Sequence, residues 1–320
     1  MTASSLDIGM CFHREAPAAD VIDQARNAEQ LGYDEFWVIE DCFFTAGVSL
    51  AAAALTTTER IRVGLGIMPV VARTAAMSAM EIATLAGLAP GRFHAGMGHG
   101  VQSWMAQMGV RPDSPVTALT EVLTEVRALL AGERRTFHGR YVTLDDVALH
   151  APPDPVPLVS AGVRGPKSLA VAGACADGTI LADFVGADYV TWARDQIAAE
   201  PHRITVFASA AVSTNGDEAR QAISHWFAEV CEDAPTSLRM APFFGELEER
   251  AGRSSWLDAV QAMPADWWSM IGAVGTPDDA LAYLESLAAV GVDAVAIFPN
   301  PDDPTGHAQW LMDAVVARRG

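Results

Sequence analysis

Short apolar runs alternate with longer stretches of helical periodicity along the whole chain. Eight runs are short and β-rich and are bounded by glycine, proline or polar residues; they lie at residues 6–12, 36–40, 61–68, 92–97, 157–160, 178–182, 204–213 and 292–298. Helical spacing between the runs is clearest at Leu119, Val122, Val126 and Leu129. Strands joined by helical crossovers run parallel. The pattern therefore predicts an α/β fold, a (β/α)8 TIM barrel with residues 1–320 as a single domain, because an open doubly wound sheet more often has fewer strands.

Two segments interrupt this rhythm. Residues 133–150 alternate polar and apolar positions around Gly139, which predicts an inserted β-hairpin. Residues 217–274 have a largely helical pattern, so we expect a mostly helical insertion there. In the helix after the third strand, Met80, Ala83 and Gly87 recur on one face.

The balance of acidic and basic residues indicates which kinds of macromolecule the chain is not expected to bind. The 320 residues include 40 acidic and 21 basic ones, a formal net charge of −19, so attraction to nucleic acid or to an anionic membrane is not expected. Residues 1–7 lack the basic and apolar regions of a signal peptide, which predicts a cytoplasmic protein. The four cysteines form no C-x-x-C pair and the eight histidines no H-x-x-x-H pair, so neither a disulfide framework nor a metal site is expected.

In a barrel of this kind the reactive residues lie at the carboxyl ends of the strands and in the loops that follow. Five such places carry chemically useful residues and a sixth is weaker; they are residues 11–13, 40–44, 66–73, 96–104 and 161–167, then 183–184. Apolar side chains at these ends could form the floor and lid of a site for a planar cofactor, although such residues are more often core; they are Phe44, Met68, Met97, Trp104, Met105 and Met108.

The strongest candidate for an anion site is residues 160–167, SAGVRGPK. A strand there runs into Gly162, Val163, Arg164 and Gly165, and a helix then starts at a proline next to Lys167, the one lysine of the chain. Free backbone N–H groups at the helix start, aided by the two cationic side chains, would hold a phosphate. An ordinary turn between strand and helix with two exposed cations explains the same residues.

Two further strand ends carry polar or flexible residues. Asp41 could accept a hydrogen bond from a ligand, or cap the next segment. Cys42 could act as a proton donor only if its neighbours perturbed the thiol, and inert packing is the simpler interpretation. The glycines of residues 96–100 let the backbone approach a flat ligand, but they lack the G-x-G-x-x-G spacing of a dinucleotide site. A nicotinamide-dependent dehydrogenase is therefore disfavoured.

The order and spacing of several motifs together resemble one family. Residues 25–33 (ARNAEQLGY), 275–279 (GTPDD) and 291–293 (GVD) carry the resemblance over nearly the whole chain. The sequence resembles the bacterial luciferase-like flavin-dependent oxidoreductases, and most of all the branch that uses the deazaflavin coenzyme F420, which includes methylenetetrahydromethanopterin reductase. The resemblance implies a luciferase-like TIM barrel that forms a homodimer.

The resemblance also implies roles for single residues. The third strand should end in a bulge with a non-prolyl cis peptide bond between Gly66 and Ile67, next to Met68, that supports the cofactor ring from behind. Asp41 should face the ring. The remaining cofactor-binding residues come from two loops: Gly98, His99 and Gly100 should line one side of the ring, and Gly162, Val163, Arg164 and Gly165, with Lys167 beside them, should hold the phosphate of its side chain.

The acid/base chemistry of the family transfers less well to this chain. Relatives often have His where this chain has Cys42, and some carry acids where it has Val101 and Cys11. His99 and His13 are the nearby groups whose ordinary pKa suits proton transfer near neutrality. The candidate catalytic residues are therefore His99, His13 and Cys42.

These observations predict an oxidoreductase that transfers a hydride between coenzyme F420 and a small organic substrate. The first alternative is an FMN-dependent luciferase-like monooxygenase, because reduced FMN can activate oxygen through a ring nitrogen that deazaflavin lacks. The second is a flavin- or deazaflavin-binding protein without catalysis, suggested by Cys11, Cys42 and Val101.

Overall fold

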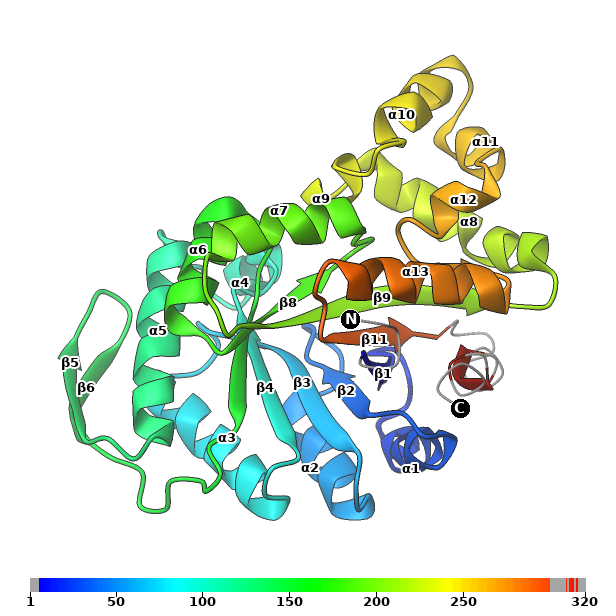
Figure 1. The fold of residues 1–320 in the computed structure, drawn as a ribbon. Coiled ribbons are helices and arrows are strands. Elements are labelled where there is room, and N and C mark those ends of the chain that lie inside the picture. Colours follow the sequence, from blue (N-terminus) through cyan, green and yellow to red (C-terminus); the bar gives the residue numbers. More distant parts are fainter. Residues whose placement is uncertain (1–5, 300–308, 310, 314, 316–320) are drawn as a thin grey trace. The chain divides into compact units, whose positions relative to one another are not determined.

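The computed structural model describes residues 6–299, 309, 311–313 and 315 (Figure 1). Contacts within the chain group these residues into two compact units. The amino-terminal unit comprises residues 11–180 and 196–203, and the carboxy-terminal unit comprises residues 6–10, 181–195 and the described residues from 204 onward. The single-domain organisation expected from the sequence stays a prediction.

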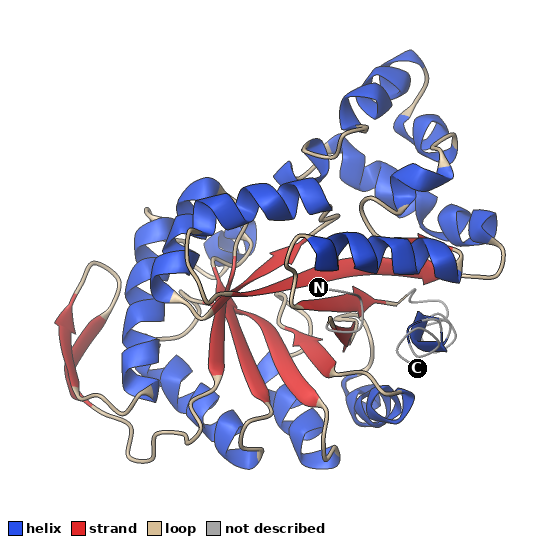
Figure 2. Cartoon of the chain, viewed as in Figure 1, coloured by secondary structure: helices blue, strands red, loops and turns tan. Residues whose placement is uncertain are grey.

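Five parallel strands form the sheet of the amino-terminal unit. They hydrogen-bond in the order β2 (Glu35–Ile39), β3 (Arg62–Pro69), β4 (Phe93–Gly98), β7 (Leu158–Gly162) and β8 (Gly178–Ala182), of which residues 178–180 belong to this unit and pair with β7. The helices of this unit lie outside the fan of strands in Figure 2; they are η2 (Ala18–Asp20), α1 (Val21–Leu31), α2 (Gly47–Thr57), α3 (Ala75–Leu88), α4 (Gln102–Gln107), α5 (Pro115–Leu130) and α6 (Pro166–Cys175). Because the strands run in one direction, the residues that follow them meet at one edge of the sheet.

The carboxy-terminal unit contains a second set of parallel strands. β1 (Asp7–Cys11), β11 (Ala294–Phe298), β9 (Arg203–Val212) and β10 (Ala273–Gly275) hydrogen-bond in that order. The helices α7 (Ala187–Ile197) and α13 (Pro277–Ala289) belong to this unit. Thr276 caps α13, since its Oγ1 accepts the Asp279 N–H at 3.2 Å. Apart from the short β10 and the hairpin, the described strands and helices alternate along the chain in the order of a (β/α)8 TIM barrel.

The inserted hairpin is present as predicted. β5 (Arg135–His138) and β6 (Thr143–Val147) are antiparallel. Its turn is held by the carboxylate of Glu121 on α5, which accepts the backbone N–H groups of residues 140–142 at 2.8, 2.8 and 3.0 Å. The guanidinium of Arg135 donates to both oxygens of the buried Glu125 at 2.8 and 2.9 Å. The hairpin is thus fastened to α5 at both ends.

The helical insertion is also present and has a core of its own. It consists of α8 (Gly216–Glu232), α9 (Thr236–Arg239), α10 (Phe244–Arg253), α11 (Trp256–Gln261) and α12 (Ala265–Trp268). Its aromatic residues pack on one another: the rings of Phe243 and Trp267 stack at 4.8 Å, and those of Phe227 and Trp268 lie 5.0 Å apart. These aromatic side chains are therefore used in the core of the insertion.

The face of α3 (Ala75–Leu88) predicted from Met80, Ala83 and Gly87 is present, but it is not the most buried face of the helix. Met80, Ala83 and Gly87 do share a face of α3, but Met80 is 48% exposed, and the buried face is formed instead by Ala79, Ile82 and neighbouring residues. The helix is apolar on nearly every side, so its periodicity does not identify the buried face.

A buried polar cluster lies within the sheet of the amino-terminal unit. The Trp37 ring covers Gly64, where a β-carbon would overlap the indole, and stands edge-on to His94 at 4.9 Å. His94 Nε2 is 2.7 Å from the hydroxyl of Ser160. Burial, with Arg203 and Arg62 acting in the same direction, lowers the pKa of His94 to about 3.

The buried His94 should make the protein sensitive to acid. The unfolded chain binds a proton at this residue below pH ~6.5, whereas the folded chain remains neutral there down to pH ~3. Its contribution to the free energy of unfolding should therefore fall by about 1.4 kcal/mol per pH unit through this window as the pH is lowered. Urea unfolding at pH 7 and pH 5 measures the effect.

The comparison that isolates His94 uses two variants. His94→Asn should lose less stability between pH 7 and pH 5 than the wild type, while replacing the exposed His138 by Gln should leave the pH dependence unchanged. An unchanged pH dependence in His94→Asn would contradict this account.

Candidate functional site

The end of β3 forms a wall at the edge where the strands finish. The register between β3 and β4 shifts between Leu65 and Met68, and the Gly66–Ile67 peptide bond is cis, as the family resemblance implies. The Glu40 N–H donates to the Gly66 carbonyl at 3.3 Å. Met68 is fully buried and lies opposite Met97 of β4. The bulge is therefore tied to both neighbouring strands.

The Ile67 side chain fills a hollow made by glycines of the next two strands. A β-carbon on Gly162 would lie 2.6 Å from Ile67 Cγ2, one on Gly96 would lie 3.3 Å from it, and one on Gly98 would overlap Ile67 Cδ1. Ile67 therefore leaves no room for a side chain at Gly98 and Gly162. Gly96 is confined more closely by Ile180 and the Leu65 carbonyl, which lie 2.6 and 2.7 Å from a β-carbon placed there. Gly98 and Gly162, expected to contact a cofactor, thus have a packing role that explains them directly.

A network of ion pairs and hydrogen bonds surrounds Glu40, the residue that follows β2. Arg73 donates to both oxygens of the buried Glu40 at 2.5 and 3.0 Å, and its Nε pairs with Glu81 of α3 at 2.8 Å. Glu40 also accepts the N–H of Gly47, the first residue of α2, at 3.0 Å. The loop after β3, the start of α2 and the side of α3 are thereby held together.

Asp41 lies in a turn with a cationic partner. The Phe44 N–H donates to the Asp41 carbonyl at 3.0 Å, which closes the turn. Arg14, from the loop after β1, donates to Asp41 Oδ2 at 2.6 Å and to Glu15 at 2.7 Å. Although burial acts in the opposite direction, these two hydrogen bonds raise the pKa of Arg14. The Asp41 carboxylate is therefore ion-paired with the Arg14 guanidinium.

The two cysteines near this edge are poor nucleophiles. Burial, together with Glu40 and Asp41, raises the pKa of the Cys42 thiol, and burial raises that of Cys11 well above its ordinary value. Both remain protonated near neutral pH. The Cys42–Phe43 bond is cis, and the Phe43 side chain is 65% exposed.

The loop after β4 brings His99 to the start of α6. His99 Nε2 is 2.8 Å from the hydroxyl of Ser168, and burial lowers the pKa of His99 against a weaker opposite effect of the Pro115 carbonyl. His99 Nδ1 and Gln102 Oε1 are buried and have no hydrogen-bond partner of normal geometry among the described residues. Gly100 has φ 68° and packs against Met105 and Pro69. His13, also a candidate, lies half-buried in the loop after β1.

The predicted anion site remains open in the structure. Gly165 is the N-cap of α6, and a β-carbon added there would find nothing within 4 Å. Lys167 and Arg164 are exposed, and Val163 is buried. The backbone N–H groups of Lys167 and Ser168 lie in the first turn of α6, where the helix itself cannot satisfy them. This corner can accept an anion, and the donors fit a phosphate.

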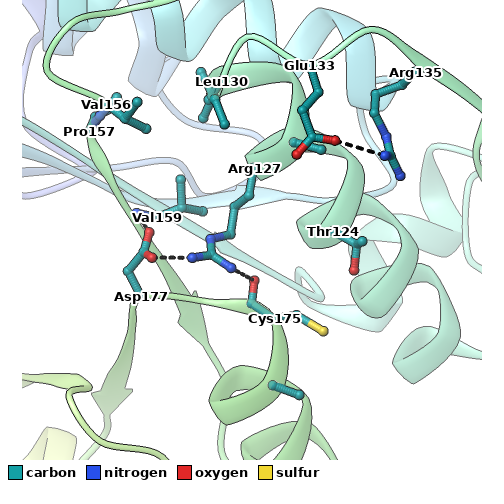
Figure 3. A pocket seen from close by; sticks show the side chains of 13 residues that line it. Thr124, Arg127, Leu130, Glu133, Arg135, Val156, Pro157, Val159, Cys175 and Asp177 are labelled. Atoms are coloured by element: carbon teal, nitrogen blue, oxygen red, sulfur yellow. Dashed lines mark hydrogen bonds and ion pairs between the residues drawn. The ribbon is translucent and has the colours of Figure 1, made fainter.

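Two cavities in the described part of the chain lie away from this edge. One of about 440 Å³ is lined by the start of β7 and the ends of α5 and α6; there Arg127 binds Asp177 and the Cys175 carbonyl (Figure 3). The other, of about 370 Å³, is in the carboxy-terminal unit and includes Tyr189 and Met240. Neither contains a residue that the sequence singled out for the cofactor.

Arg14 and Ser168 were not among the site residues predicted from the sequence, and Arg73 was only the last residue of the segment 66–73. Each acts across a long separation in the chain: 27 residues from Arg14 to Asp41, 33 from Arg73 to Glu40 and 69 from Ser168 to His99. The sequence predicted that these positions lie at strand ends and at a helix start, but it did not predict which side chains they contact. Within the described residues, no group of three or more His, Cys, Asp or Glu side chains could hold a metal ion, and no helix is long and apolar enough to cross a membrane.

Two relatives with known names are similar to this sequence over half of its length or more. A 5,10-methylenetetrahydromethanopterin reductase of Methanolobus tindarius is 28% identical over 222 residues, which are 67% of this chain and 68% of that protein. An F420-dependent glucose-6-phosphate dehydrogenase of Beutenbergia cavernae is 34% identical over 177 residues, about half of each chain (51% and 52%).

The fold is shared with a solved structure over almost its full length. The coenzyme F420-dependent tetrahydromethanopterin reductase of Methanopyrus kandleri matches with a TM-score of 0.84 and 20% identity, over 99% of this chain and 100% of that one. This similarity confirms the predicted luciferase-like (β/α)8 TIM barrel. The family model described as luciferase-like monooxygenase matches residues 5–294. The chain belongs to this luciferase-like family.

Proposed function

We propose that this protein is an oxidoreductase that transfers a hydride between coenzyme F420 and a small organic substrate. The observation that carries the proposal is the pairing of two features at one edge of the amino-terminal unit. The Gly66–Ile67 bulge forms a fixed wall, and the start of α6 is an open anion site. A planar ring with a phosphate on its side chain has both of the features that this edge could bind. The F420 dependence named for the relatives supports the same cofactor.

The residues present fit this cofactor. Gly66 and Ile67 would support the ring, and Asp41 would accept a hydrogen bond from a ring N–H. Gly98, His99 and Gly100 would border the ring, with His99 Nε2 held 2.8 Å from the hydroxyl of Ser168 in α6. The phosphate would be held by the first N–H groups of α6 and by its cations; the residues of that corner are Gly162, Val163, Arg164, Gly165 and Lys167.

The chain's own side chains limit the proton chemistry. When bound, the deazaflavin supplies the carbon that carries the hydride. Cys42 stays protonated, because burial and neighbouring carboxylates raise the pKa of its thiol. His99 is neutral and shares a hydrogen bond with Ser168, so it serves to position the loop against α6. His13, the third candidate catalytic residue, lies half-buried in the loop after β1, and its role stays a prediction of the sequence.

The choice between F420 and FMN is tested by binding. The family is described as monooxygenases, so an FMN-dependent monooxygenase is the second candidate function. Fluorescence titration of the purified protein should give tighter binding of F420 than of FMN. Binding of FMN alone would reverse the assignment. Reduced cofactor that binds but is not oxidised by a panel of enones, imines and alcohols would favour a binding protein without catalysis.

The phosphate site is tested best at Gly165. A β-carbon added there meets no protein atom within 4 Å, so a valine should obstruct the ligand with little disturbance of the packing. Gly165→Val should lower F420 affinity about tenfold or more by blocking access to the first turn of α6, while the free energy of unfolding changes by less than about 1 kcal/mol.

The control is Gly245→Val, at an equally open position in the first turn of α10, which should keep wild-type affinity. Gly162 is unsuitable because a side chain there would collide with Ile67. If Gly165→Val bound F420 as the wild type does, the phosphate would have to lie elsewhere.

We also propose a homodimer formed by the outer face of α2 and α3. Glu81 is the one charged residue of these two helices, and it pairs with Arg73. Met77 and Met80 on this face are 45% and 48% exposed. A helix that is apolar all round is normally buried. Two copies that each carry a formal charge of −19 repel one another, so they should meet at an uncharged face.

Charges on this face should separate the dimer. Met77→Glu/Met80→Glu should convert a dimer to a monomer in light scattering, because paired carboxylates would have to be buried at the contact. Val156→Glu, at another exposed apolar position of the same unit, should remain dimeric. A monomeric wild type, or a dimeric double variant, would refute this interface.

A cytoplasmic location and the absence of a nucleic-acid partner stay predictions of the sequence.

A further inference from the structure

Arg14 contacts both ends of the turn that carries Asp41. At one end its Nη1 donates to Asp41 Oδ2 at 2.6 Å. At the other end its guanidinium carbon lies 4.8 Å from the centre of the Phe44 ring. The turn between these residues is closed by the hydrogen bond from the Phe44 N–H to the Asp41 carbonyl, at 3.0 Å. One side chain from the β1 loop therefore holds the first and last residues of the turn.

The guanidinium is itself fixed in orientation. Its Nε donates to Glu15 at 2.7 Å, so two carboxylates bind its edge while an aromatic ring packs on its face. The Arg14 and Asp41 side chains are 38% and 27% exposed, and ion pairs at such positions add little to stability. Three simultaneous contacts do, however, fix the orientation of the planar guanidinium group. The arrangement is better suited to orienting the turn than to stabilising the fold.

The remaining oxygen of Asp41 is the one that matters for a ligand. Oδ2 is taken by Arg14, and Oδ1 makes no hydrogen bond to the described residues. A carboxylate held through one oxygen presents the other in a fixed direction. The same turn carries Phe43, whose side chain is largely exposed.

We propose that Arg14 is a positioning residue that fixes the 41–44 turn and directs Asp41 Oδ1 at the cofactor ring. The proposal rests on the proposed function for the identity of the ring. Arg14 acts through Asp41 and does not itself bind the cofactor or the substrate. A direct contact between Arg14 and an anionic group of either ligand is the competing arrangement, and the experiment separates the two.

A double-mutant cycle tests whether Arg14 acts through Asp41. F420 affinity is measured by fluorescence for the wild type, Arg14→Gln, Asp41→Asn and the double variant. Arg14→Gln should weaken binding about tenfold in the wild-type background and less than about twofold in the Asp41→Asn background. Equal losses in both backgrounds would mean that Arg14 touches the ligand directly, and would overturn the proposal.

Hydrogen exchange tests the turn without any cofactor. Arg14→Gln should speed exchange of the Phe44 amide several-fold in the ligand-free protein, because the turn loses its clamp. Unchanged exchange would overturn the proposal even if affinity fell. If the wild type failed to bind F420, that result would count against the proposed function, and the exchange measurement would still decide whether Arg14 holds the turn.

Arg140 offers a matched control in the same unit. It pairs with Asp113 at 3.0 Å and lies 5.3 Å from the centre of the Tyr141 ring, so it has the same kinds of contact as Arg14 but on the hairpin. Arg140→Gln should change neither F420 affinity nor exchange at Phe44. An equal effect in this control would show that the Arg14 result reflects a general loss of charge, and would overturn the proposal.

Discussion

The packing of one side chain, Ile67, onto glycines of two neighbouring strands is the constraint on which the site depends. Its methyl groups occupy the space where β-carbons of Gly98 and Gly162 would lie. The bulge of β3 is therefore held from the side by β4 and β7, and from the other side by the Glu40 N–H. A wall fixed in this way can support a flat ring without rearranging when the ring arrives, which keeps the cost of binding low.

Charge pairs arrange the loops around this wall. In a chain with an excess of 19 negative charges, the arginines at the strand ends are matched to specific carboxylates. Arg73 joins Glu40 to α3, and Arg14 joins Asp41 to the β1 loop. Such pairs add modestly to stability where they are exposed, but each one fixes the orientation of the two side chains that it joins. At the α6 corner, Lys167 is exposed in the first turn of a helix whose own N–H groups favour an anion.

The sequence predicted the architecture because buried parallel strands leave a strong pattern. Eight strand positions, the hairpin and the helical insertion agree with the structure to within a few residues. The helices α2, α4 and α7 were not identified from periodicity. α2 is rich in alanine and apolar on most sides, and α4 is six residues long, so neither shows a clear amphipathic repeat. The site was predictable in its location and less so in its contacts. Gly98 and Gly162 were recognised as special, but that Ile67 fills the space above them could not be read from the sequence.

A crystal structure of the protein with F420 bound tests the central claim most directly. This account predicts that the ring lies against the Gly66–Ile67 bulge and that a phosphate oxygen accepts hydrogen bonds from the N–H groups of Lys167 or Ser168. A ring bound away from the bulge, or a phosphate held at a place other than the start of α6, would contradict it.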